Sequence, residues 1–129
     1  MKTGMNDIYL APDKEKPTLT INMEGLPLIT YLFKLVDGNE TVLWTHSGKN
    51  KKGTNQQFPL DTTLTVPQLD QLILELVGTV TSLDGSEKPY SVAVTITQDG
   101  KDQRMPIDNM PDTKNGVANY DSAVRLCVP

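Results

Sequence analysis

The chain has 129 residues, which is enough for one domain with a hydrophobic core and too few for two such domains. Threonine and leucine are the most frequent residue types and alanine occurs only four times, so the composition favours β-sheet over helix. The formal net charge of −4 argues against a nucleic-acid or anionic-membrane binder, which would need a basic surface.

Cys127 is the only cysteine, so the chain can form neither an intrachain disulfide nor a thiolate metal cluster. Its N-terminal region lacks the apolar segment of a secretory signal, and no run is long enough to span a bilayer. We therefore expect a soluble protein, either cytoplasmic or exported without a conventional signal.

The first strands follow a polar N-terminal region. Residues 1–17 contain two prolines and four consecutive charges, and we expect a loose arm or a short edge strand ahead of a single domain over residues 18–129. Apolar and polar side chains then alternate over residues 18–23 and 28–36, which predicts two strands.

A tight-turn sequence, Asp37-Gly38-Asn39, predicts a hairpin between the second strand and a return strand over residues 40–46. Residues 47–57 (SGKNKKGTNQQ) are polar and contain glycine, which indicates a long surface loop. Alternation resumes over residues 58–66 and predicts another strand.

The stretch from Leu72 to Gln98 contains two runs of alternating apolar residues joined by a turn sequence that includes glycine and proline. This pattern predicts a long β-hairpin. The apolar positions over residues 67–77 also recur at the spacing of a short helix, with Pro67 near its start and Gly78 as a possible cap.

The C-terminal part contains a turn at Asp99-Gly100, a short strand ending at Ile107, a long polar loop over residues 108–121 and a last strand over residues 122–128. Seven or eight strands separated by turn sequences predict an all-β fold, a two-layer antiparallel β-sandwich of immunoglobulin-like type.

The two long polar loops should lie at the same end of the sandwich, because successive connections between strands alternate between its ends. Loops at the end of a rigid sandwich are common binding surfaces. Side chains there, or at a strand end leading there, could contact an anion or sugar hydroxyls. These candidates are His46, Lys49, Asn50, Asn55, Gln57, Asn119 and Tyr120.

Two aromatic residues have alternative roles. Tyr120 lies in the second loop and is the candidate for an exposed aromatic contact, although its ring could instead cover the sandwich edge. Trp44 shares the parity of core residues, which favours packing in the interior over sugar stacking.

Acidic side chains of the connections could converge as oxygen ligands for Ca²⁺. The candidates are Asp84, Glu87, Asp108, Asp112 and Asp121. Their spacing does not match the EF-hand pattern, and acidic residues in turns commonly serve the backbone instead.

The residues needed for catalysis are scarce in this sequence. His46 is the only histidine, so it would have to be the base of any serine or cysteine mechanism. Phosphate-binding glycine loops and paired zinc-binding histidines are absent from the sequence.

We therefore expect a non-enzymatic β-sandwich module for binding or assembly. Sheet edges expose unpaired backbone groups, so a protein partner or self-association is the first hypothesis. A small-ligand receptor, such as a lectin or a calcium-dependent carbohydrate binder, is the alternative, and a small hydrolase is a third.

Overall fold

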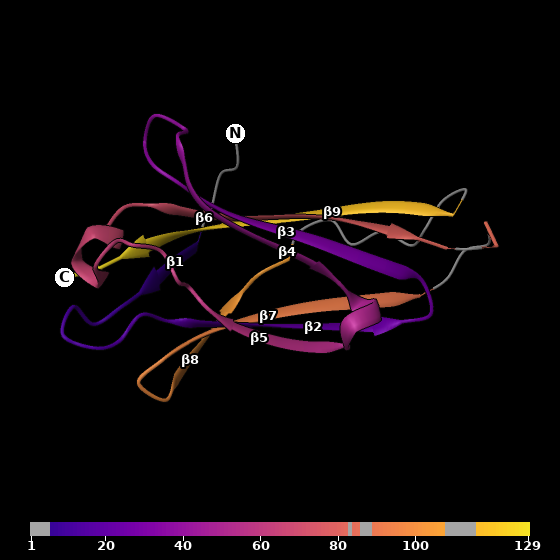
Figure 1. Cartoon of the computed structure of the whole chain (residues 1–129), viewed down its shortest axis with the longest axis horizontal. Coiled ribbons are helices and arrows are strands. Elements are labelled where there is room, and N and C mark those ends of the chain that lie inside the picture. Colours follow the sequence, from indigo (N-terminus) through magenta and orange to yellow (C-terminus); the bar gives the residue numbers. More distant parts are fainter. Residues whose placement is uncertain (1–5, 83, 86–88, 108–115) are drawn as a thin grey trace.

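The computed structural model describes residues 6–82, 84–85, 89–107 and 116–129. Two sheets pack face to face (Figure 1). The strand order is β1-β9-β6-β3-β4 in the first, here called sheet A, and β5-β2-β7-β8 in the second, sheet B. The predicted all-β, two-layer sandwich is confirmed, although the described residues form nine strands and the expected number is seven or eight. The immunoglobulin-like type of this sandwich stays a prediction.

The strands of sheet A are β1 (Asn6–Tyr9), β9 (Val117–Cys127), β6 (Ile73–Thr81), β3 (Leu28–Val36) and β4 (Val42–Lys49). Those of sheet B are β5 (Asn55–Pro59), β2 (Thr18–Gly25), β7 (Tyr90–Gln98) and β8 (Lys101–Met105). The described part of the chain also contains two single turns of 3₁₀ helix, η1 (Asn50–Lys52) and η2 (Val66–Leu69).

Alternation along the strands places one face of each sheet in a common core. In β3 the inward residues Ile29, Tyr31, Phe33 and Leu35 are at most 3% exposed, whereas the residues that alternate with them up to Lys34 are half-buried. The facing strand β2 contributes Leu19 and Ile21, which are also fully buried. Aliphatic side chains from both layers therefore meet in one seam, which is the main apolar contribution to stability.

The N-terminal strand β1 is the exception to antiparallel pairing. It runs parallel to β9, with Asn6 opposite Val124 and Tyr9 opposite Cys127. The chain between β1 and β2 passes from sheet A to sheet B, so β1 and β2 do not form a hairpin.

Both runs of the expected 72–98 hairpin are strands, but the hairpin itself is wrong. The first run is β6, which pairs with β3 and β9, and the second is β7, which pairs with β2 and β8. Alternation shows which face of a strand is buried but does not show in which layer the strand lies. Two strands in opposite sheets bury their apolar faces as well as two paired strands do. The expected hairpins β3–β4 and β7–β8 are confirmed.

The helix considered over residues 67–77 is not formed. Only η2 is helical, and extended structure begins at Ile73. A capping box at Thr65 and the following prolyl residue start the turn, and the positive φ of Gln71 (69°) ends it. The apolar residues that fitted both patterns are shared between the two elements: Leu69, the last residue of η2, and Leu74 of β6 are both buried in the core.

Two of the expected loops contain strand. Residues 47–57 include the end of β4 and the start of β5, and the strand expected over 58–66 ends at Pro59. In the expected loop 108–121, β9 begins at Val117, and residues 108–115 lie outside the described residues.

The β2–β3 connection and η1 lie at the same end of the sandwich, as the alternation of connections predicts. The side chain of Asn50 in η1 accepts a hydrogen bond from the Ile29 amide (3.1 Å) and donates one to the Pro27 carbonyl (2.9 Å). Figure 1 shows η1 at the right, where the chain crosses from β4 to β5.

Candidate functional site at the β4 edge

Four strands lie at sheet edges in the described part of the chain: β1 and β4 in sheet A, β5 and β8 in sheet B. Natural proteins protect such strands from pairing with other chains by keeping them short or by placing charges or proline on them. β1 has four residues, β5 has five and ends in Pro59, and β8 has five and exposes Lys101, Asp102 and Arg104. Three of the four edges are therefore protected.

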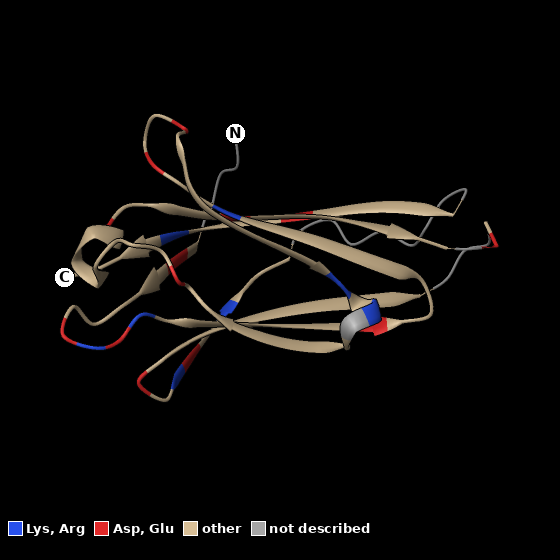
Figure 2. Ribbon diagram, in the orientation of Figure 1, with Lys and Arg blue, Asp and Glu red and all other residues tan. Residues whose placement is uncertain are grey.

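The fourth edge, β4, lacks these protections. It has eight residues, VLWTHSGK, with neither proline nor charge before Lys49 at its end. Figure 2 shows the strand without charge up to its end, where it meets η1 at a lysine. Its first two residues, Val42 (50%) and Leu43 (40%), are exposed apolar side chains. From Trp44 to Lys49 it pairs with β3 without irregularity, and the single register shift lies at Leu35/Val36.

Aromatic side chains support β4 from the inside. The His46 ring stacks on Phe58 of β5, with centroids 3.8 Å apart and an interplanar angle of 22°. Trp44 stacks beside His46 at 6.1 Å, and its indole N–H donates to Asp61 Oδ1 (2.6 Å). Trp44 is half-buried and packs against the core at the rim of the sandwich. These contacts join the edge strands of the two sheets.

Gly48 leaves room for the Tyr31 side chain at the end of β4. It faces Tyr31 on β3, and a β-carbon at this position would lie 2.5 Å from the Tyr31 hydroxyl oxygen, so no larger residue fits without movement. That hydroxyl donates to Gln56 Oε1 (2.6 Å), while Gln56 Nε2 donates to the carbonyls of Lys49 (2.7 Å) and Gly53 (2.8 Å). Gln56 therefore fixes the end of β4 to the start of β5.

A depression of about 560 Å³ opens at this edge. It is lined by Thr30, Tyr31, His46, Ser47, Gly48, Lys49 and Gln56. Two of the expected contact residues, His46 and Lys49, are among these. Aromatic faces, an amide and an ammonium group at one opening are suited to bind a small polar ligand.

The other candidates of this region have different positions. The Asn50 side chain bonds the backbone through both its oxygen and its nitrogen, so Asn50 is a structural residue of η1. Asn55 and Gln57 are exposed on β5, where Gln57 Nε2 lies 3.4 Å from Thr20 Oγ1. The structure thus brings together only part of the expected set.

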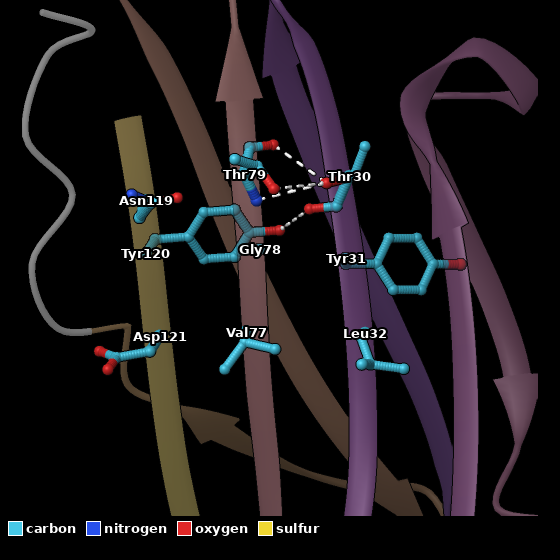
Figure 3. A pocket seen from close by; sticks show the side chains of 9 residues that line it. All are labelled: Thr30, Tyr31, Leu32, Val77, Gly78, Thr79, Asn119, Tyr120 and Asp121. Atoms are coloured by element: carbon cyan, nitrogen blue, oxygen red, sulfur yellow. Dashed lines mark hydrogen bonds between the residues drawn. The ribbon is translucent and has the colours of Figure 1, made fainter. Parts of the chain in front are cut away.

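Asn119 and Tyr120 lie on β9, two strands away from β3. They line a second depression of about 590 Å³ together with residues of β3 and β6. Figure 3 shows the Tyr120 ring crossing Gly78, with its hydroxyl directed at the Thr30 carbonyl, to which it donates a hydrogen bond (2.7 Å). Tyr120 is 2% exposed, so the expected exposed aromatic contact is wrong and the alternative, a covered ring, is observed.

Burial raises the pKa of Tyr120 above its ordinary value of 10.0, and the nearby Tyr90 and Tyr31 add to this effect. Burial also raises the pKa of Tyr31. Both phenols therefore stay neutral and act as hydrogen-bond donors at physiological pH.

The expected calcium ligands are only partly described. Asp84 accepts a hydrogen bond from Ser82 Oγ (2.9 Å), and Asp121 lies on β9 opposite Val77. Glu87, Asp108 and Asp112 lie outside the described residues. Within the described ranges, no three His, Cys, Asp or Glu side chains are grouped in a way that could hold a metal ion.

His46 and Cys127 cannot form a nucleophile–base pair within one chain. β4 and β9 are separated by β6 and β3, so the two strands are about 14 Å apart at the usual spacing. Burial is the main cause that raises the pKa of the Cys127 thiol, so thiolate character is not favoured there.

Comparisons with known proteins give no relative: no family model, curated protein or solved structure matches this chain. In the part of the chain that the structure describes, no helix has the length and apolar character needed to cross a bilayer.

Several residues of the β4 edge were not among the sequence candidates. Gly48 and Thr45 are examples, because their positions at this edge depend on which strands are neighbours. The signal that could have indicated the edge is the uncharged run from Val42 to Gly48 between an acidic turn and a lysine-rich segment.

Proposed function

We propose that this chain is a non-enzymatic β-sandwich module that binds protein by accepting an added strand at β4. The observation that carries the proposal is the contrast among the four edges. β4 combines eight residues, no internal charge and exposed aliphatic side chains, whereas β1, β5 and β8 carry features that prevent pairing.

The support beneath β4 adds to this proposal. The His46–Phe58 stack and the Gln56 hydrogen bonds hold the strand in an extended conformation before any partner arrives. A preformed edge loses little conformational entropy on binding, so main-chain hydrogen bonds contribute more of their energy to affinity.

Selection from a random peptide library, with peptides long enough to span β4, tests strand acceptance. We expect selected peptides to slow amide hydrogen exchange over Val42–Lys49 and to leave β8 unchanged. Failure to select any peptide, or protection confined to other segments, would contradict the proposal.

A second candidate function is binding of a small carbohydrate in the depression beside His46 and Tyr31. The supporting observation is the group of aromatic rings and hydrogen-bonding side chains that line it. A glycan array, run with and without calcium, tests this function. Binding that is lost in His46→Ala supports it, and no binding on either array rejects it.

A further inference from the structure

The two ends of β4 carry opposite charges. Asp37 and Glu40 belong to the β3–β4 turn that precedes the strand, whereas Lys49 ends it and Lys51 follows in η1. Glu40, Lys49 and Lys51 are exposed. The Asp37 carboxylate accepts hydrogen bonds from the amides of Asn39 (2.8 Å) and Thr41 (3.0 Å), which hold it in place in the turn.

This polarity distinguishes the two directions in which an identical strand could add. A parallel copy would place acidic turn beside acidic turn and lysine beside lysine. An antiparallel copy places each acidic end against the lysine end of the other, and this favourable contact occurs twice. The uncharged middle of the strand opposes neither direction.

We infer that the strand added to β4 is β4 of a second copy of this chain, antiparallel and related by a two-fold axis at Thr45. This inference rests on the proposed function and names its partner. With the axis at Thr45, Leu43 lies opposite Ser47 of the second copy, and Trp44 lies opposite its His46. Lys49 then lies opposite Thr41 of the second copy, next to Glu40.

The pairing is isologous, so it closes after two copies and does not continue into a fibre. It joins the two copies of sheet A into one continuous sheet and covers part of the exposed surface of Val42 and Leu43. The Trp44–His46 stacking seen within one chain would recur between copies on the inner face.

Thr45 allows a sharp test because the two-fold axis places Thr45 of one copy opposite Thr45 of the other. It is exposed on β4, so charged substitutions there should leave the fold intact. Light scattering over a concentration series should show a dimer for the unaltered full-length chain. Thr45→Lys and Thr45→Glu each place like charges together, and each should weaken dimerisation by roughly tenfold or more.

An equimolar mixture of the two variants should restore the dimer, because lysine then faces glutamate. Gln57→Lys and Gln57→Glu, on the exposed edge β5, are the matched controls and should dimerise like the unaltered chain. A monomer at every concentration, or variants that self-associate equally well alone and mixed, would overturn the inference.

The outcomes separate this inference from the proposed function. If the chain stays monomeric while library peptides still protect β4 from hydrogen exchange, the second copy is wrong and strand acceptance stands. If neither dimer nor peptide engages β4, both fail.

Discussion

Tyrosine and glycine alternate on a single rung across four strands of sheet A. Tyr120, Gly78, Tyr31 and Gly48 lie opposite one another on β9, β6, β3 and β4. Each tyrosine ring lies over the glycine of the next strand. The aromatic ring covers the backbone that glycine leaves bare, so each pair functions as one packing unit.

Gly78→Ala should therefore destabilise the sandwich. The added β-carbon would lie 2.1 Å from Cζ of the Tyr120 ring, and displacing a buried ring should cost about 1–3 kcal/mol. Gly38→Ala is the matched control, because nothing lies within 4 Å of the new atom and its backbone is not in the left-handed region. Urea denaturation measures both, and equal midpoints would contradict the packing argument.

The raised pKa of Tyr120 also predicts that the fold loses stability at alkaline pH. Because its pKa is raised in the folded state, the neutral phenol stabilises the fold fully below pH 10, the ordinary tyrosine value, and this contribution is lost as pH rises towards the folded pKa. Tyr120→Phe should lower stability by about 1 kcal/mol at neutral pH, through loss of the Thr30 hydrogen bond, and should flatten the decline above pH 10.

Urea denaturation between neutral pH and the alkaline range checks this prediction. Tyr9→Phe, at a residue 63% exposed, is the control and should keep the profile of the unaltered chain. Part of the alkaline decline should survive in Tyr120→Phe, since burial also raises the pKa of Tyr31. An unchanged slope would show that the phenol does not contribute.

Two glutamine side chains attach the N-terminal segment to sheet B. Gln98 of β7 accepts from the Ala11 amide (2.7 Å) and donates to the carbonyls of Ala11 (3.0 Å) and Glu15 (2.9 Å). Gln103 of β8 pairs with the amide (2.9 Å) and carbonyl (2.7 Å) of Tyr9. The side-chain amides of these glutamines therefore bond the backbone of the N-terminal segment, as the backbone of a neighbouring strand would do in a sheet.

Gln98→Glu should break this attachment. A carboxylate cannot donate to two carbonyls, and at a site only 7% exposed the mismatch should cost roughly 3 kcal/mol. Hydrogen exchange at the Ala11 amide should accelerate along with the loss of stability. Gln57→Glu, the same change at an exposed position, should alter neither measurement. Equal behaviour of the two variants would contradict the assigned role of Gln98.

Alternation was sufficient to locate most strands but not to assign them to layers. β3 occupies residues 28–36 as expected, and β7 begins and ends close to its expected bounds. The error over β6 and β7 arose because a buried face looks the same in either sheet. The prediction that Tyr120 lies in a loop is wrong for a related reason. Its neighbours on the outer face of β9 are polar, and a run of polar residues has the composition of a loop.

At the scale of the whole molecule, the two lateral openings of the sandwich are closed in different ways. Aromatic stacking and Gln56 close the opening between β4 and β5, whereas β1 and the glutamine contacts close that between β9 and β8. Ile8 and Leu10, which are 3% and 2% exposed, reach inward there. β1 thereby covers the edge of β9, which would otherwise be an eleven-residue strand paired only with β6.

Removal of residues 1–10 should therefore destabilise the chain and create a new adhesive edge. Loss of two buried aliphatic side chains should lower the free energy of unfolding by roughly 3–6 kcal/mol, and the bare β9 should promote aggregation. Urea denaturation and light scattering measure these effects, and a synthetic peptide of residues 1–10 added in trans should reverse both.

Substitutions within residues 7–10 distinguish the effect of burial from that of chain length. Ile8→Ala with Leu10→Ala should reproduce most of the instability, whereas Asp7→Ala with Tyr9→Ala, at exposed positions of the same segment, should have little effect. The Asp7–Arg125 ion pair (3.9 Å) is solvent-exposed, so its loss contributes little. A truncated chain as stable as the full one would mean that the core is complete without β1, and β9 would then be a second edge open to partners.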